Sequence, residues 1–323
     1  MALTDEGLVP TSDLLSRWVS LSTGVRAHYM TAGSSGPAIL MLHGGLNGSS
    51  GLAGWREVAP ALSAQGFRVY CPDFPAYGLT VDRGGRVYGY GLDALVRFVD
   101  DFVDAVGLDT FHLVGNSLGC NVGAHYIVNN TDRVLTFTGI AGAFGDVVPN
   151  DPVLVPANRG NVNITFDGTA ESMRVILEGL VLDKSKVTDD LVEMRTLAAN
   201  NQSEDYPHMI GQFFRDARGE GDANDSVRHR TAGRLNEITT PAIYIYGAKD
   251  TLHPVEHAYF QEECLPNFQV FYPPHCGHQS QTDDPALHTQ IIVELIRDKK
   301  ISAATAKAMG VSDRRPVSDL VEH

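Results

Sequence analysis

The segment "FHLVGNSLGCNVGAHYIV" at residues 111–128 constrains the fold more than any other part of the sequence. It places Ser117 between Gly115 and Gly119, directly after an apolar β-branched run and directly before a run of helical character. This spacing matches G-x-S-x-G, in which a strand turns straight into a helix and a strained backbone exposes the serine hydroxyl. A side chain at either glycine would collide with the neighbouring strand or helix, which explains both glycines. The alternative interpretation is an ordinary strand-to-helix turn with a capping serine.

Short apolar runs alternate with longer helical stretches along most of the chain. Continuous apolar strands that alternate with helices predict a mainly parallel sheet, covered by helices on both faces. Residues 17–33 have the pattern of an antiparallel hairpin leading into that sheet. The predicted strands are 38–44, 67–73, 111–116, 135–141, 242–248 and 268–274.

The strand pattern is interrupted after residue 141, where the sequence becomes polar and helical until about residue 235. We therefore predict a helical cap inserted over the carboxyl ends of the strands, where the active site of such a sheet lies. Apolar cap residues either line a pocket or pack the cap's own helices or its underside: Met173, Ile176, Leu177, Leu180, Met209, Phe213 and Phe214. The predicted division is a core domain at 1–145 and 236–300, a cap at 146–235 and a tail at 301–323, with a helix at 286–300 before the tail.

The composition favours a large globular protein that acts on a small molecule. The 323 residues are 43% hydrophobic, which is enough for a sizeable core. The formal net charge of -14, without a basic cluster, disfavours nucleic acid and anionic membranes as partners. Neither a signal peptide nor an apolar run of about 18 residues is evident, so we expect a cytoplasmic protein. A homo-oligomer is compatible with the sequence, which shows no interface. The four cysteines lack CxxC spacing, which predicts free thiols.

A nucleophilic serine needs a base to take its proton and an acid to orient that base. Asp250 lies just past a predicted strand end in "YIYGAKDTLHP", and His278 lies after the next strand in "YPPHCGHQSQ". The alternative for Asp250 is a helix N-cap. His275 competes with His278 as the base, but Gly277 gives the loop its freedom next to His278.

Acyl chemistry also needs hydrogen-bond donors for the oxyanion that develops in the transition state. The loop "LHGGLNGSSG" follows a strand, so the backbone N–H of Gly45 could act together with that of Leu118 at the start of a helix. His43 is then expected to be hydrogen-bonded beneath this loop in a structural role. The remaining histidines lack metal-site spacing and the loop lacks a GKS/T ending, so we predict no metal and no cofactor.

These motifs resemble the α/β-hydrolase superfamily over nearly the whole chain, with "PDFPAYGLT" in the place of its strand-end loop. Within it, "LHGG", "GNSLG", "HCGH" and the insertion "VILEGLVLDKSKVTDDLVEMRTLAANNQ" look like the meta-cleavage product hydrolases, which split a carbon–carbon bond in ring-opened dienoates. The resemblance implies that Ser117, Asp250 and His278 are the catalytic triad and that Gly45 and Leu118 are the oxyanion donors.

The same resemblance assigns Asn116 as a polar positioning group and Arg195 as the cap residue that meets the substrate carboxylate. A guanidinium can hold a carboxylate through two parallel hydrogen bonds. The alternative is a solvated helix arginine near Glu193. Gln279 and Thr196 stand where that family has Trp and an aromatic residue, and Gln279 beside the base would change the shape and polarity of the substrate pocket.

The sequence thus supports two enzymatic hypotheses on one scaffold. The first is a serine hydrolase that cleaves a carbon–carbon bond in a carboxylated 1,5-diketone. The second is a carboxylesterase or lactonase, which would use the same groups with an alkoxide as the leaving group. A third hypothesis, a ligand receptor without turnover, conflicts with the presence of Ser117, Asp250 and His278.

Overall fold

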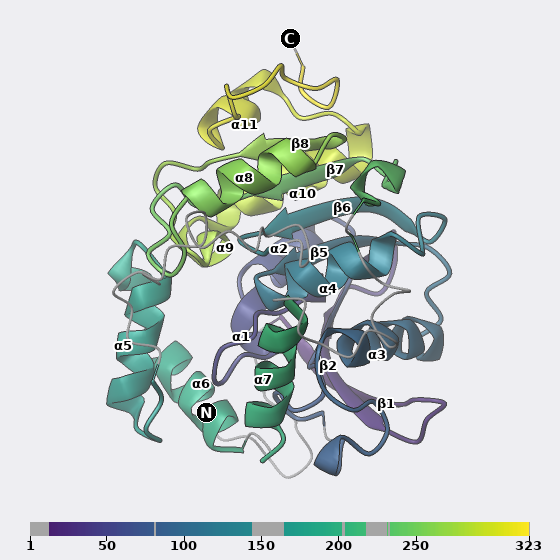
Figure 1. The fold of residues 1–323 in the computed structure, drawn as a ribbon, viewed down its shortest axis with the longest axis vertical. Coiled ribbons are helices and arrows are strands. Elements are labelled where there is room, and N and C mark those ends of the chain that lie inside the picture. The colour runs from purple at the N-terminus through teal and green to yellow at the C-terminus, as the bar shows by residue number, and fades with distance from the viewer. Residues whose placement is uncertain are drawn as a thin grey trace.

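The computed structural model describes residues 13–80, 82–143, 165–201, 204–217, 231 and 233–322. The strands of this part of the chain form one sheet of eight strands in the order β1-β2-β4-β3-β5-β6-β7-β8 (Figure 1). Their bounds are β1 (Leu15–Ser20), β2 (Arg26–Ala32), β3 (Ala38–Leu42), β4 (Arg68–Pro72), β5 (Phe111–Asn116), β6 (Val134–Ile140), β7 (Ala242–Ile245) and β8 (Phe268–Phe271).

The direction of the strands confirms the predicted sheet. Strands β1 and β2 form the expected antiparallel hairpin, and β2 also pairs with β4 in antiparallel fashion. From β4 to β8 every neighbouring pair is parallel. All residues of β3 and β5 are buried, as expected of strands covered on both faces. The carboxyl ends of six parallel strands therefore lie along one edge of the sheet.

Helices cover both faces of the sheet. Figure 1 shows α3, α4 and α8 in front of the strands and α2 and α10 behind them. Helix α4 packs on β3, β5 and β6 and against α3, so every one of its residues is buried. The core helices are α1 (Gly51–Trp55), α2 (Val58–Ala64), α3 (Leu92–Ala105), α4 (Leu118–Ile127), α8 (Glu256–Cys264), α9 (Ser280–Asp283), α10 (Pro285–Asp298) and α11 (Ala303–Ala308). Short 3-10 turns lie at Arg83–Gly85, at Lys184–Lys186 in the insertion between β6 and β7, and at Leu235–Glu237 before β7.

The last two strands end three residues earlier than the sequence predicts. The ladder of β7 and β8 stops at Ile245 and Phe271, although the apolar run continues in both segments. Beyond this point the two segments become loops that approach each other. Their closeness is shown at Gly247, where a Cβ atom would lie 2.1 Å from the carbonyl oxygen of Gly277. The loops that leave the sheet here carry Asp250 and His278.

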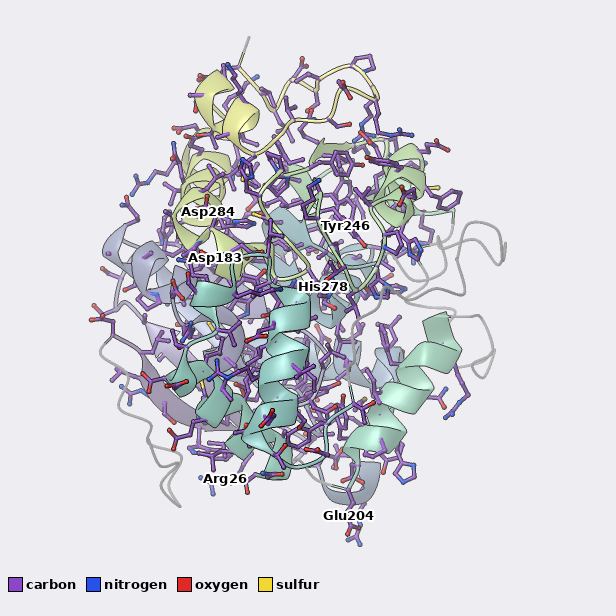
Figure 2. The ribbon with its side chains drawn as sticks, turned by 90° about the vertical axis from the view of Figure 1, so that its left-hand side faces the viewer. Arg26, Asp183, Glu204, Tyr246, His278 and Asp284 are labelled. Carbon is purple, nitrogen blue, oxygen red and sulfur yellow. The ribbon has the colours of Figure 1, made fainter. Side chains whose placement is uncertain are left out.

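The described part of the insertion between β6 and β7 is helical. It contains α5 (Ala170–Leu180), α6 (Asp189–Asn201) and α7 (Tyr206–Ala217), of which α5 packs on α6, α6 on α1, and α7 on α3. Figure 2 shows His278 and Asp183 at the upper end of this group. The predicted start of the cap at residue 146 lies outside the described residues, and its predicted end at residue 235 lies in the 3-10 turn Leu235–Glu237 that precedes β7.

The predicted apolar residues of the insertion divide among three groups. Met173 and Leu177 pack within the insertion, while Met209 and Phe213 join the main core. Ile176 and Leu180 form a small cluster with Leu252 of the loop after β7. The side chain of Phe214 is outside the described part of the structure.

The C-terminal segment covers the outer edge of β8. The N–H of Tyr272 donates to the oxygen of Gly310 (2.7 Å), and the N–H of Ser312 donates to the oxygen of Val270 (2.9 Å). Helix α10 ends at Asp298, close to its predicted end, and α11 follows it. Because an uncovered edge strand invites pairing with other chains, this segment protects the edge of the sheet.

The cysteines and the helices were also the subject of predictions from the sequence. All four cysteines are free thiols, as predicted. None of the helices in the described ranges combines the length and the apolar character that crossing a membrane requires.

Candidate active site

Ser117 occupies the sharp corner that the sequence predicts between β5 and α4. Its backbone has φ 53° and ψ −115°, a strained conformation for a residue other than glycine. A Cβ atom on Gly115 would lie 2.3 Å from the oxygen of Gly119, and one on Gly119 would lie 2.2 Å from the oxygen of Leu42. Both glycines are therefore required by close backbone contacts.

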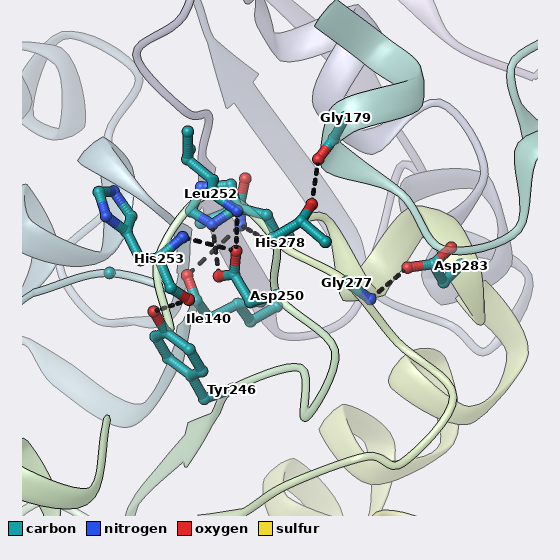
Figure 3. A network of polar contacts seen from close by, with 12 residues as sticks. Ile140, Gly179, Tyr246, Asp250, Leu252, His253, Gly277, His278 and Asp283 are labelled. Carbon is teal, nitrogen blue, oxygen red and sulfur yellow. Dashed lines mark hydrogen bonds and ion pairs between the residues drawn. The ribbon is translucent and has the colours of Figure 1, made fainter. Parts of the chain in front are cut away.

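Asp250 and His278 form a buried pair next to this corner. His278 Nδ1 lies 2.8 Å from Asp250 Oδ2, and Asp250 Oδ1 accepts the N–H groups of Leu252 (2.8 Å) and His253 (3.0 Å), as Figure 3 shows. Burial by itself would raise the pKa of Asp250, but His278 and the His253 N–H outweigh it and hold the pKa below its ordinary value. An ionised Asp250 fixes the imidazole with Nδ1 as donor, which leaves Nε2 free to act as a base.

The structure also decides between the alternatives that the sequence left for this pair. His275 is exposed, whereas His278 is buried and paired with Asp250. The helix after this loop, α8, has Val255 and not Asp250 at its N-cap. The aspartate therefore contacts the histidine and does not cap a helix.

Asn116 connects the serine corner to the histidine loop. Its amide nitrogen donates to the carbonyl oxygens of Ile140 (3.4 Å) and His278 (3.5 Å). Among the described residues Ser117 Oγ has no hydrogen-bond partner, so a bond from Ser117 to His278 Nε2 is not formed in this state. Catalytic hydrogen bonds of this kind often tighten only when substrate binds.

The loop after β3 lies against the start of α4. A Cβ atom on Gly45 would come within 3.0 Å of two side-chain atoms of Leu118, so the two predicted oxyanion donors belong to touching segments. Leu118 is the first residue of α4, where backbone N–H groups have no partner within the helix. The Leu118 N–H is therefore left for a partner outside the helix, beside the segment that carries Gly45.

His43 fixes the peptide that carries the Gly45 N–H. Its Nδ1 lies 2.7 Å from the oxygen of Gly44, and its Nε2 accepts the N–H of Phe74 (3.0 Å). Burial lowers the pKa of His43 to about 4, so the ring is neutral, with Nδ1 as the donor. In a trans peptide the C=O and N–H point in opposite directions, so holding the Gly44 oxygen sets the direction of the Gly45 N–H. His43 thus has the structural role that the sequence predicts.

Two tyrosine hydroxyls hold the next peptide of this loop. The oxygen of Gly45 accepts from Tyr77 (2.9 Å) and from Tyr206 of α7 (3.2 Å). Tyr77 belongs to the "PDFPAYGLT" loop, whereas Tyr206 comes from the insertion. Sequence analysis did not identify either residue, because the hydroxyls meet the loop only in the folded chain.

Asp73 supports the same region and was also missed by sequence analysis. Its carboxylate accepts the N–H groups of Gly51 (2.7 Å) and Leu79 (2.9 Å) and lies 2.8 Å from His28 Nδ1. Burial would raise the pKa of Asp73, but His28, His43 and the Leu79 N–H together hold it below its ordinary value. The available signal was its position at the end of a strand in "PDFPAYGLT".

Arg195 of α6 is buried against the loop after β3 (residues 43–50), with 2% of its surface exposed. Its Nη2 donates to the oxygen of Asn47 (2.6 Å) and to Ser49 Oγ (3.1 Å), while its Nε has no hydrogen-bond partner. Burial lowers the pKa of Arg195 to about 10, and no carboxylate within the described ranges pairs with it. The alternative of a solvated helix arginine is therefore wrong.

Gln279 and Thr196 occupy the two positions where the sequence departs from the resembling family. Gln279 is buried beside His278, and its N–H donates to the oxygen of Leu180 (2.9 Å). Thr196 Oγ1 donates to the oxygen of Val192 within α6 (2.7 Å). In the part of the chain that the structure describes, no cluster of three or more His, Cys, Asp or Glu side chains is arranged to hold a metal ion.

Residues 37–285 match the family described as alpha/beta hydrolase fold. The chain belongs to the α/β-hydrolase family. That match spans well over half of the 323 residues, and the parallel sheet and the serine corner described above fit it. This α/β-hydrolase is therefore an enzyme of the hydrolase class.

Curated relatives of this α/β-hydrolase are named as hydrolases of 2-hydroxy-6-oxo dienoic acids. The chain is 25% identical to a 2-hydroxy-6-oxononadienedioate/2-hydroxy-6-oxononatrienedioate hydrolase of Paraburkholderia phymatum, over 88% of this chain and 97% of the relative. It is 28% identical to a 2-hydroxy-6-oxo-6-(2'-aminophenyl)hexa-2,4-dienoic acid hydrolase of Metapseudomonas resinovorans, over 81% and 84%. The crystal structure of a meta-cleavage product hydrolase from Pseudomonas fluorescens aligns with a TM-score of 0.69 at 23% identity, covering 88% of this chain and 98% of that one.

Proposed function

We propose that this α/β-hydrolase cleaves a carbon–carbon bond in a carboxylated ring-opened dienoate, with Ser117 as nucleophile, His278 as base and Asp250 as the residue that orients the base. The observation that carries the substrate class is the buried Arg195, which lacks a carboxylate partner among the described residues. We also propose that residues 146–235 form a cap and that the N–H groups of Gly45 and Leu118 are the oxyanion donors.

Arg195 supports a carboxylate substrate for an energetic reason. A buried guanidinium without a counterion is unfavourable, and an anionic ligand would relieve that cost. The Nε–H of Arg195 has no acceptor and can donate to a ligand. Its Nη2 already donates hydrogen bonds to Asn47 and Ser49 of the loop that carries Gly45. A substrate carboxylate at Arg195 would therefore be bound next to the loop that is proposed to stabilise the oxyanion.

The proposed reaction has three stages. The dienol of the substrate first takes its keto form, so that the bond to be cleaved lies next to an electron sink. Ser117 Oγ then attacks the remote carbonyl while His278 Nε2 takes the hydroxyl proton, and the Gly45 and Leu118 N–H groups stabilise the oxyanion. Breaking of the carbon–carbon bond places its electron pair on the enol fragment, which receives the proton from His278. Water activated by His278 finally hydrolyses the acyl-enzyme.

The names of the curated relatives support this substrate class. Both describe hydrolases of 2-hydroxy-6-oxo dienoic acids, and the two compounds share the carboxylated dienol end but differ in the group beyond the remote carbonyl. A site that recognises the shared end through Arg195 would accept this class of compound. An ester or lactone lacking that carboxylate would gain nothing from Arg195.

The direct test offers the purified protein a yellow 2-hydroxy-6-oxo dienoate and, separately, p-nitrophenyl esters. We expect fast bleaching of the dienoate, and loss of at least about 10⁴-fold in kcat for both substrates in Ser117→Ala. Turnover of the ester without bleaching would replace the proposal with an esterase. Unchanged turnover in Ser117→Ala, with circular dichroism showing a folded protein, would remove Ser117 as nucleophile.

Arg195→Met tests the substrate class separately from the nucleophile. We expect kcat/KM for the dienoate to fall by about 100-fold or more, because a charge-assisted pair with the carboxylate is lost, while ester turnover changes little. Arg215→Gln is the matched control, since Arg215 is an exposed insertion arginine bonded to Gln212 of its own helix. An equal loss for dienoate and ester would show that Arg195 supports the fold and not the substrate.

A further inference from the structure

Asp283 is a buried carboxylate that the proposed reaction does not use. It is the last residue of α9, five residues after His278. Asp283 Oδ2 accepts the N–H of Gly277 (2.7 Å), and Oδ1 accepts the N–H groups of Leu182 (2.8 Å) and Asp183 (2.9 Å). One carboxylate therefore binds the residue before His278 and the segment that follows α5 of the insertion.

Other contacts bring the same two segments together. The N–H of Gln279 donates to the oxygen of Leu180, and a Cβ atom on Gly277 would lie 3.0 Å from that oxygen. Thr251 Oγ1, next to Asp250, donates to the oxygen of Gly179 (2.7 Å), a contact visible in Figure 3 with that of Asp283 to Gly277. The end of α5 thus contacts the loops of both Asp250 and His278, and we call residues 179–183 with 277–283 the cap junction.

We propose that Asp283 is a positioning residue that couples the insertion to the catalytic histidine. Its two oxygens bind the two sides of the cap junction, so a displacement of residues 182–183 is transmitted through Gly277 to His278. This inference rests on the proposed triad, because positioning of His278 matters for turnover only if His278 is the base.

A neutral amide is the sharpest probe of this role. Asp283→Asn keeps the shape of the side chain, but only one of its two terminal atoms can accept a hydrogen bond. Either the N–H of Gly277 or the N–H groups of Leu182 and Asp183 then face an NH₂ group and lose their acceptor. Asp283→Glu keeps both acceptors and places them one methylene further out.

The experiment compares these variants with Asp284→Asn in the full-length protein. Asp284 is the matched control, because its carboxylate caps α10 by accepting the N–H of Leu287, and asparagine is also a good N-cap. The measurements are p-nitrophenyl acetate turnover per active site and amide hydrogen exchange at Gly277, Leu182 and Asp183.

We expect Asp283→Asn to lower kcat about tenfold or more, with a smaller change in KM, because small displacements of catalytic groups reduce rates strongly. Exchange should become faster on both sides of the cap junction. Asp283→Glu should lose less activity than Asp283→Asn, and Asp284→Asn should behave like the unmodified protein. If Asp283→Asn fails to fold, the same comparison is made with Asp283→Glu against Asp284→Asn.

The proposal is overturned if Asp283→Asn retains the kcat of the unmodified protein, or if exchange rises at Gly277 while residues 182–183 stay protected. These outcomes differ from failure of the proposed function. An unmodified protein that does not bleach the dienoate would leave the exchange result untouched, since exchange requires no substrate.

Discussion

Two regions flank Ser117, and each is organised by a carboxylate that binds backbone N–H groups. On one side Asp73 joins the end of the loop that carries Gly45, through Gly51, to its own "PDFPAYGLT" loop, through Leu79. On the other side Asp283 joins the two segments of the cap junction. The difference is that Asp73 also has a histidine partner, His28, whereas no ion pair of Asp283 occurs within the described ranges.

This difference changes the direction of the pKa shift. His28 and the other partners of Asp73 overcome burial and lower its pKa, whereas burial raises the pKa of Asp283 despite its three N–H partners. The charged form is therefore favoured by folding at Asp73 and disfavoured at Asp283. The side that carries Gly45 is fixed by a compensated charge, and the cap junction is held by a carboxyl group whose charged form folding disfavours.

The largest effect on stability is expected from Asp73→Asn, which should lower the free energy of unfolding at pH 7 by roughly 3 kcal/mol, because it breaks a buried pair. The stabilisation from ionised Asp73 is present above the ordinary pKa of 3.8 and is lost as the pH falls through the lower folded value. Urea unfolding at several pH values should therefore show the deficit of the variant shrinking below about pH 4. A deficit that is independent of pH would contradict the ionic role of Asp73.

His43→Ala tests whether the proposed oxyanion donor Gly45 acts on the chemical step. Release of the Gly44 oxygen frees the Gly45 N–H to turn, so we expect kcat to fall by about 100-fold, as for loss of one oxyanion donor. His112→Ala is the control: burial lowers the pKa of this histidine to about 4 as well, but it lies at the start of β5, away from Ser117. Equal losses of kcat in both variants would show a general effect of removing a buried histidine.

Asp283→Asn should differ from Asp73→Asn in its pH dependence. Because folding raises the pKa of Asp283, the native state takes up a proton between the ordinary and the folded value, and the unmodified protein loses stability as the pH rises through that window. At pH 7 the variant should be within about 1 kcal/mol of the unmodified protein. Its relative deficit should increase on acidification, as measured by urea unfolding. A deficit that shrinks on acidification, as for Asp73→Asn, would break the contrast between the two regions.

Thr251→Val is expected to have the smallest effect. It removes the exposed hydrogen bond to the oxygen of Gly179, which should lower the free energy of unfolding by about 0.5 kcal/mol. Thr196→Val is the control, because the Thr196 hydroxyl binds an oxygen of its own helix. If the cap junction depends on several contacts, amide exchange at residues 182–183 should rise in Thr251→Val and not in Thr196→Val.

The sequence predicted the parallel part of the sheet, the N-terminal hairpin and the corner at Ser117. These features depend on local rules: apolar runs form buried strands, and a backbone contact near 2 Å from a Cβ position permits only glycine at 115 and 119. The ends of β7 and β8 were predicted three residues too far along, because the apolar run continues into the loops that carry Asp250 and His278.

The sequence by itself determined the order of the elements and the candidate residues Ser117, Asp250 and His278, since each follows directly from a motif or a strand end. Only the tertiary structure decided that Arg195 is buried, that His28 pairs with Asp73 across 45 positions, and that Asp283 reaches Leu182 across 101. The physical reason is that burial, and with it the sign of a pKa shift, depends on which distant segments pack together, and no local pattern in the chain records this.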